Sequence, residues 1–487
     1  MSGRAEAPET PASSNGQAPR AHDGAGVREG VRGDPPLTGR LEAWMTELLA
    51  DPRSCAALLR RYGSPVNVIE PAPLRRNADE LIGAAQASGV PCGLFFARKA
   101  NKALSLVDEV VRLGHGVDVA SETELRQVLQ RGVPGERIIV SAAVKPDSLL
   151  RLALRHRATI SLDSLAEADV VATLAAATGT TARVAPRLAP PPHLGLPPSR
   201  FGEVPDAWSA LPAAGQGVQV VGLHVHLHGY AAADRARMLP DAARLAEVLR
   251  ERGHRPDFVD VGGGVPMSYL DDAGEWQAFW TAHRQSLARA DESITWKNRE
   301  LAAVYPFHQA PVRGDWLRGL LQAPLADGSA AEVLRSAGLR LHLEPGRALL
   351  DGCGLTLARV AFVKTRSDGV PLVGLEMNRT QCRSTSDDFL VDPILVRSPE
   401  SDARPSGPPL KAFLVGAYCI EDELILLRRM RFPRGVAVGD MIALVNTGGY
   451  LMHILESASH QIPLARNVVR RRGGFEPDPI DAWNGRG

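Results

Sequence analysis

Short apolar runs alternate with amphipathic helical segments along most of this chain. Helical periodicity covers, for example, residues 103–113, 122–131 and 234–252. Alternation of strands and helices is typical of a parallel sheet. This many units favour a closed (β/α)8 barrel, with an open doubly wound sheet as the alternative, because periodicity does not report closure. The predicted barrel strands are 94–98, 117–119, 137–141, 159–162, 183–188, 218–226, 258–261 and 340–344.

The two ends of the chain have different patterns. Residues 1–38 are rich in Pro, Gly, Ala, Ser and charge without a hydrophobic period, which predicts a disordered tail. Residues 39–72 predict a helix and a short strand, and we expect this strand to join a second domain. After residue 347 short β-rich runs replace the helices, which predicts an all-β domain over 347–487. The barrel then spans 73–346, and 293–338 is interpreted as an insertion before its last strand.

The composition limits the class of protein. A chain of 487 residues exceeds one ordinary core, and its formal net charge of +1 gives no electrostatic signature for nucleic acid or an anionic membrane. No apolar stretch is long enough to span a bilayer, and the N-terminus has no apolar core of a secretory signal. Five widely spaced cysteines argue against a disulfide framework. We therefore expect a cytoplasmic protein.

Candidate chemistry falls at the predicted strand ends. The carboxyl ends of parallel barrel strands meet at one mouth, where active sites lie. Lys99 ends the first strand among apolar neighbours, where desolvation disfavours its ammonium and makes the amine a better nucleophile. The other polar residues at strand ends are Asp118, Ser121, Glu124, His224, His226, His228, Gly262, Gly263, Gly264, Glu344 and Arg347.

Most of these residues have a simpler interpretation as well. The three glycines suit a phosphate, but any tight turn favours Gly. The three alternating histidines face one side, yet no further ligand stands at close spacing, so we predict no metal site and at least one buried interior histidine. Asp118 and Glu124 are alternatively a helix cap and an exposed helix charge. Lys102 competes with Lys99, while Cys419 and Tyr450 are alternatively core residues.

Seven segments together identify a family resemblance over about residues 62–453. The chain resembles the fold-type III decarboxylases that use pyridoxal phosphate (PLP). This group contains diaminopimelate, ornithine and arginine decarboxylases and is related to alanine racemase. The segments that carry the resemblance are 96–101, 116–124, 222–226, 260–264, 344–347, 415–419 and 448–450.

The resemblance implies an alanine racemase-type (β/α)8 barrel, a C-terminal β-barrel domain and bound PLP. Lys99 is then the lysine that binds the cofactor, His226 stacks on its ring, and Glu344 keeps the ring nitrogen protonated. Cys419 returns a proton to Cα after CO2 leaves, and in the family it comes from the partner subunit, which implies a homodimer. The other residues assigned to the cofactor are Asp118, Glu124, Gly262, Gly263, Gly264, Gly346, Arg347 and Tyr450.

The sequence departs from the family near the expected substrate. Ile420 follows Cys419, where relatives that act on diamino acids carry an acid, and Glu423 is displaced from that place. A distal ammonium against Ile420 would lack a partner. Arg379 and Arg383 are candidates for a substrate carboxylate. The departures favour a divergent branch and an amino acid with a neutral or acidic side chain.

Three functions compete at this stage. The first is decarboxylation of an α-amino acid through a carbanion that a pyridinium stabilises. The second is racemisation or epimerisation, with Cys419 or a histidine as the second base, although the resembling racemases place an arginine where Glu344 stands. The third is PLP binding without catalysis, for which the β domain with Cys419 and Tyr450 would be unnecessary.

Overall fold

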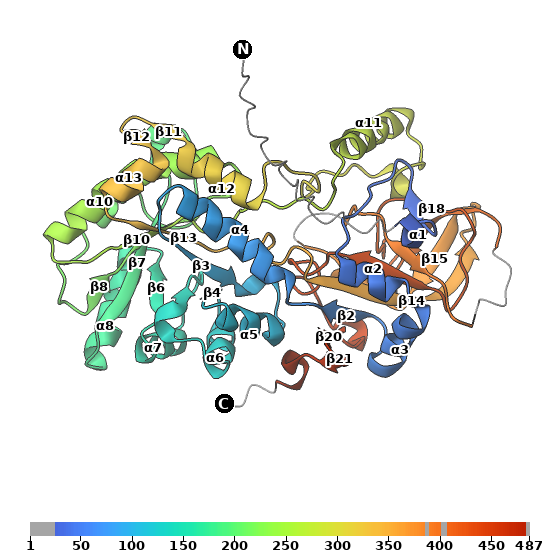
Figure 1. Ribbon diagram of the computed structural model, residues 1–487, viewed down its shortest axis with the longest axis horizontal. Helices are drawn as coiled ribbons and strands as arrows, with labels where there is room; N and C mark the ends of the chain where they lie inside the picture. Colours follow the sequence, from blue (N-terminus) through green and yellow to red (C-terminus); the bar gives the residue numbers. More distant parts are fainter. Residues whose placement is uncertain (1–24, 385–388, 401–406, 484–487) are drawn as a thin grey trace, which may run out of the picture.

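The computed structural model describes residues 25–384, 389–400 and 407–483, which form a barrel domain beside a β domain (Figure 1). Eight parallel strands pair in sequence, and the last pairs with the first, so the sheet closes. The predicted (β/α)8 barrel is confirmed. Its strands are β3 (Cys92–Ala97), β4 (Gly116–Val119), β5 (Ile138–Val140), β6 (Thr159–Leu162), β7 (Ala182–Leu188), β9 (Leu223–Val225), β10 (Phe258–Asp260) and β13 (Arg340–Leu343).

Amphipathic helices cover the outside of the barrel. In α5 (Leu104–Arg112) the buried residues Leu106, Val107 and Val110 recur at helical spacing and face the sheet. The predicted sixth strand is two strands, because a break at residues 221–222 separates β8 (Val218–Val220) from β9. The other barrel helices are α4 (Pro73–Ala87), α6 (Glu122–Gln130), α7 (Asp147–Arg155), α8 (Leu165–Ala177), α9 (Pro205–Trp208), α10 (Ala232–Glu251), α12 (Arg313–Gln322) and α13 (Ala330–Ser336).

The segment that leaves the barrel differs from the predicted 293–338 insertion. Helices α12 and α13 belong to the outer helical layer and pack with α10. The excursion instead occupies about residues 265–312, and its helix α11 (Ala273–Arg289) lies over the β domain (Figure 1). Trp296 N donates to Leu427 O at 3.0 Å, which joins the excursion to that domain. The sequence periodicity predicts where helices form, but it does not predict which domain each helix packs against.

The β domain is one mixed sheet of ten strands. The N-terminal strand β2 (Val66–Ile69) pairs with β14 and β20 and so lies in this sheet. Helices α2 (Ala43–Leu49) and α3 (Pro52–Tyr62) precede it. The other strands are β1 (Arg32–Gly33), β14 (Gly354–Thr365), β15 (Pro371–Leu375), β16 (Ile394–Val396), β17 (Leu410–Val415), β18 (Met430–Phe432), β19 (Met441–Val445), β20 (Arg466–Arg471) and β21 (Gly474–Pro477).

The predicted disordered tail is wrong for residues 25–38, and residues 1–24 lie outside the described part. Strand β1 pairs with β18, and the buried Leu37 donates its N–H to Asp392 Oδ2 at 3.0 Å. Val31 and Leu37 are isolated apolar anchors, so they leave no hydrophobic period to detect. No helix in the described ranges has both the length and the apolar character needed to cross a membrane.

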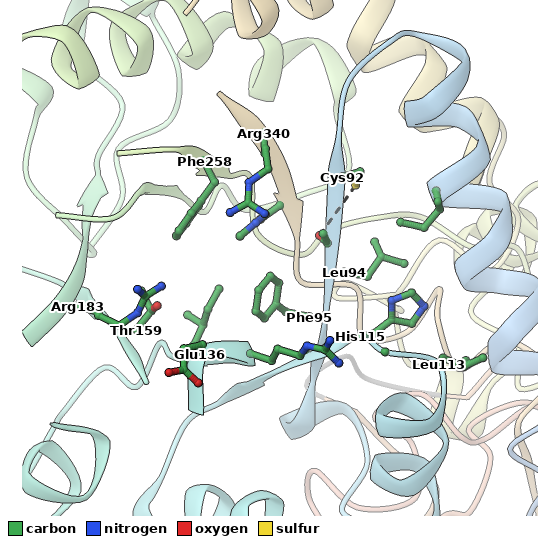
Figure 2. Close-up of a pocket in the computed structure, with 17 residues that line it drawn as sticks. Cys92, Leu94, Phe95, Leu113, His115, Glu136, Thr159, Arg183, Phe258 and Arg340 are labelled. Atoms are coloured by element: carbon green, nitrogen blue, oxygen red, sulfur yellow. Dashed lines mark hydrogen bonds between the residues drawn. The ribbon is translucent and has the colours of Figure 1, made fainter. Parts of the chain in front are cut away.

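Three rings close the amino-terminal end of the barrel, and each lies over a glycine of a neighbouring strand or turn. A Cβ on Gly116 would lie 2.4 Å from Phe95 Cδ1, and one on Gly93 would lie 2.9 Å from His342 Cδ2. Phe258 covers Gly222 in the same way, and Figure 2 shows Phe95 and Phe258 at this end. A side chain at any of these three positions would clash with the neighbouring ring, so glycine is required there.

Replacing Gly222 with alanine should destabilise the barrel. The new Cβ would lie 2.3 Å from Phe258 Cζ, and overpacking a core costs about 1–3 kcal/mol. Gly83→Ala is the matched control, because Gly83 lies in α4 with no atom within 4 Å of its Cβ position. It should gain about 0.5–1 kcal/mol of helix stability. Urea unfolding measures both, and equal effects of the two substitutions would contradict this packing.

Candidate active site

Lys99, Asp118, His226 and Glu344 meet at the carboxyl end of the barrel. Lys99 lies in the 3-10 turn η1 (Arg98–Ala100) directly after β3, and Asp118 lies in the neighbouring strand β4. His226 and Glu344 directly follow β9 and β13. The parallel direction of the strands thus brings together residues that are far apart in sequence.

Lys99 is held as an ammonium in this structure. Its Nζ donates to Asp118 Oδ2 at 3.0 Å, and Asp118 also accepts from Ser141 Oγ. Burial acts to lower the pKa of Lys99, but the charges of Asp118 and Glu344 raise it above its usual value. The prediction that desolvation favours the neutral amine is therefore wrong for this state, because buried carboxylates offset the desolvation.

Glu344 is a buried carboxylate without a hydrogen bond. Its oxygens lie 3.5 Å from His224 Nε2 and 3.5 Å from His226 Nδ1, and neither forms a hydrogen bond within the described residues. Burial alone would raise the pKa of Glu344, but the two imidazoles and the Lys99 ammonium hold it well below its usual value. An ionised carboxylate with unused acceptor oxygens fits a ligand that presents an N–H group.

Of the three histidines, His224 is buried, and His226 and His228 are more accessible. His224 is 1% exposed and forms a 2.6 Å hydrogen bond through Nδ1 with Ser161 Oγ, so it is the expected interior histidine. Burial lowers the pKa of His226 to about 4, which makes its imidazole neutral near pH 7. His228 is exposed and lines the cavity described below.

The tertiary structure supplies a third potential metal ligand that close sequence spacing did not reveal. Donor atoms of His224, His226 and Glu344 all lie within 4.8 Å of one another. However, the positive charge of Lys99 is already near Glu344 and contributes to lowering its pKa. That charge disfavours a divalent cation at the same place.

The glycine run forms a close-packed turn behind His226. Gly262 has φ +68°, and a Cβ there would lie 2.5 Å from His226 Nδ1. Gly264 has φ +73° and lies against the fully buried Arg235, which donates to the carbonyl oxygens of Gly229 and Gly263. Arg235, which sequence reasoning missed, therefore ties two loops of the barrel mouth together.

A cavity of about 340 Å³ opens at this mouth between the two domains. Arg347 lines it, donates to Gly449 O at 3.0 Å and Tyr269 Oη at 2.7 Å, and forms no ion pair in the described part of the chain. Its guanidinium lies 4.0 Å from the centre of the Tyr305 ring. Tyr269 and Tyr305 come from the 265–312 excursion. This segment thus holds an unpaired cation at the site.

Two further predicted residues stand close to Arg347. Tyr450 lines the same cavity and adopts φ +70°, with its N–H donating to Ala100 O at 2.7 Å. A Cβ on Gly346 would lie 2.6 Å from the Tyr450 hydroxyl oxygen, so this glycine makes room for the phenol. Tyr450 is therefore a cavity residue rather than a core aromatic.

Glu124 has a local structural role. Its Oε2 accepts from Ala120 N at 2.7 Å, and its own N–H donates to Ser121 Oγ at 3.2 Å. This is a capping arrangement at the start of α6. Ser121, not Asp118, is the N-cap. Lys102 is tied to Glu456 at 2.6 Å, which separates it from Lys99.

The remaining predicted residues lie in the β domain and do not line the cavity beside Tyr450. Cys419 is exposed and lines a different cavity of about 590 Å³. Glu423 is buried there, accepts from Arg379 N at 2.7 Å and lies 3.5 Å from Arg379 Nε. Arg383 donates to Leu424 O at 2.7 Å. One chain therefore presents two separate groups of candidate residues.

Sequence reasoning also missed charged residues on the opposite side of the barrel mouth. Arg187 ends β7, where its Nε is buried without a hydrogen bond and its guanidinium lies 4.1 Å from the Phe201 ring centre. Lys145 is buried and lies 2.9 Å from both carboxylate oxygens of Glu167. Their position at or just after strand ends is the signal that identifies them.

Asp118→Asn should make Lys99 easier to deprotonate. Loss of the partner carboxylate lowers the pKa of Lys99, and each unit increases the free amine about tenfold. Acetylation of the cofactor-free protein at about pH 9, followed by mass spectrometry, measures this reactivity. Lys102 is the internal control, because its partner Glu456 is unchanged. Unchanged Lys99 reactivity would show that Asp118 does not hold the ammonium.

Comparisons with known proteins agree with this geometry. Residues 78–298 match the model of the pyridoxal-dependent decarboxylase family, pyridoxal binding domain.

An uncharacterised protein of Sinorhizobium fredii is 34% identical over 433 residues, which cover 86% of this chain and 92% of that protein. A diaminopimelate decarboxylase of Actinosynnema pretiosum is 27% identical, with coverage of 86% and 88%. The crystal structure of a diaminopimelate decarboxylase from "m. jannaschi" superposes with a TM-score of 0.66 at 19% identity, with coverage of 87% and 90%. The chain belongs to the fold-type III PLP-dependent decarboxylase family.

Proposed function

We propose that the protein decarboxylates an α-amino acid with a neutral or acidic side chain. The observation that carries this proposal is the meeting of Lys99 and Glu344 at one barrel mouth. There the lysine amine and a buried carboxylate without hydrogen bonds lie on neighbouring strand ends. Neither the unused acceptors of Glu344 nor the unpaired charge of Arg347 is satisfied by the protein itself.

The residues at this mouth fit PLP, the cofactor of the family. Lys99 would hold it covalently, Glu344 would face its ring nitrogen, and His226 its ring. Arg347, Tyr450 and Gly264 line one cavity and would hold its phosphate, since an unpaired guanidinium binds such a dianion. When bound, PLP supplies an electron sink for the charge that develops at Cα.

The chain's own groups prepare the site. Lys99 Nζ must lose a proton to become a nucleophile, and Asp118 Oδ2, 3.0 Å away, is the acceptor. Burial and the charge of Glu344 raise the pKa of Asp118, which makes it a better proton acceptor. Glu344 stays ionised and would favour a protonated ring nitrogen on the bound cofactor, which would support decarboxylation over racemisation.

The loop after β17 supports the proposed substrate class. Ile420 is 44% exposed beside Cys419, and the nearest buried acid, Glu423, is already engaged by Arg379. A distal ammonium of the substrate beside Ile420 would find Glu423 already paired with Arg379, while the exposed Glu421 lines the same cavity. The pairing of Glu423 supports a substrate other than a simple diamino acid, although two relatives are named diaminopimelate decarboxylases.

A homodimer would bring the two groups of residues together. Cys419 and Ile420 are exposed on the β domain and lie outside the cavity of Arg347 and Tyr450. We propose that Cys419 of one subunit serves the Lys99 mouth of the other, where its Sγ donates the proton that replaces CO2 at Cα. The five cysteines form no disulfide with one another, which supports a reducing, cytoplasmic location.

Lys99→Ala should abolish CO2 release from the preferred amino acid and remove the lysine that borohydride links to PLP. Lys102→Ala is the matched control and should keep the link. Measuring CO2 release and loss of optical activity in parallel on an amino-acid panel separates decarboxylation from racemisation. Full activity of Lys99→Ala would exclude the proposal, and loss of optical activity without CO2 would favour a racemase.

Mixing Lys99→Ala with Cys419→Ala subunits should restore activity that neither variant has alone. Half of randomly mixed dimers carry one complete site of two, so about a quarter of the wild-type activity is expected. Mixing Lys99→Ala with Asp118→Asn is the control. Both residues lie at the barrel mouth, so every site in a mixed dimer then contains one of the two changes. No recovery with the first pair would refute shared sites.

A further inference from the structure

A second cavity, of about 380 Å³, lies at the end of the barrel opposite Lys99. It is surrounded by the amino-terminal ends of the strands, with Cys92 from β3, Gly116 from β4 and Thr159 from β6 in its wall. Figure 2 shows Phe95, Phe258, Arg183 and Arg340 around this space. The three rings that close the barrel separate it from the Lys99 mouth.

The floor of this cavity is aromatic but not flat, because the planes of the Phe95 and His342 rings are 42° apart. His342 stacks on Phe258 with ring centres 4.0 Å apart and 14° between the planes, and Phe95 lies 4.8 Å from His342. Glycines beneath these rings let them lie against the sheet. The parts of these rings that line the cavity offer the ring of a ligand hydrophobic and edge-to-face contact.

His342 is also a buried polar group that the protein leaves unsatisfied. Its side chain is only 5% exposed, and its Nδ1 has no hydrogen-bond partner in the described chain. Burial lowers the pKa of His342 to about 3, so the imidazole is neutral. The floor thus carries no charge of its own, and it offers a polar edge beside an apolar face.

The wall of the cavity is positively charged. Arg137, Arg183 and Arg340 line it, against one acid, Glu136. Glu136 is engaged at 3.0 Å by Arg157, which does not line the cavity, and Arg340 is partly held by Asp257 at 2.8 Å. Arg183 forms no ion pair or hydrogen bond within the described ranges, and its Nε is buried. The wall therefore has guanidinium donors in excess of acceptors.

We propose that this end of the barrel binds a small planar organic anion, such as an aromatic carboxylate. The ring packs against Phe95, Phe258 and His342, and the carboxylate accepts hydrogen bonds from Arg183 and Arg340. Guanidinium groups match the geometry of a carboxylate and strengthen such contacts by their charge. The site is separate from the PLP mouth and does not depend on the proposed reaction.

Calorimetric titration of the PLP-loaded protein with 2-naphthoate tests the proposal. A ligand of this size should bind with a Kd on the order of 1 mM or tighter. Arg183→Gln and Arg340→Gln should each weaken binding about tenfold, because each removes a charged hydrogen-bond donor. The neutral 2-naphthamide should bind about tenfold more weakly, and the non-planar cyclohexanecarboxylate should also bind more weakly.

Arg151→Gln is the matched control, because Arg151 is an exposed arginine on α7 that does not line the cavity. It should bind 2-naphthoate as the wild type does, and the cofactor absorbance should not change during any titration. The proposal is overturned by the absence of binding at about 10 mM. Unchanged affinity in both arginine variants, or equal affinity for the amide, would likewise overturn it.

Discussion

The barrel mouth depends on the balance of buried charge around Glu344. Two carboxylates, Asp118 and Glu344, are almost fully buried, and both interact electrostatically with the Lys99 ammonium. Isolated buried charges are costly, and the Lys99 ammonium offsets this cost for both carboxylates, whereas the charge of Glu344 opposes that of Asp118. The neutral imidazole of His226 adds polarity without charge. This balance keeps an amine and an acceptor ready at one place without a ligand.

Glycine sets the shape of both ends of the barrel for the same reason, the absence of a Cβ. At the carboxyl end Gly262 and Gly264 adopt left-handed backbone and pass close to His226 and Arg235. At the amino-terminal end Gly93 and its counterparts let rings lie against the sheet. One end thereby becomes a polar turn beside a cavity, and the other becomes an aromatic floor.

The contact between the domains completes the mouth. Arg347 leaves the last barrel strand but donates to Gly449 of the β domain and to Tyr269 of the excursion. Three distant parts of the chain therefore fix one guanidinium. The excursion also packs on the β domain through Trp296. Movement between the domains would displace Arg347, so this interface and the site are mechanically linked.

The alternation of apolar runs and helices determined the barrel, because strand and helix periods are local properties of the chain. The strand-end positions of Lys99, Asp118, His226 and Glu344 followed from the same pattern. Charge state did not, since the pKa of Lys99 depends on carboxylates that arrive from other strands. The tertiary structure alone showed the 265–312 excursion and the separation of Cys419 from Arg347. Each of these is a contact between residues distant in sequence or a choice of packing partner, and periodicity carries no information about either.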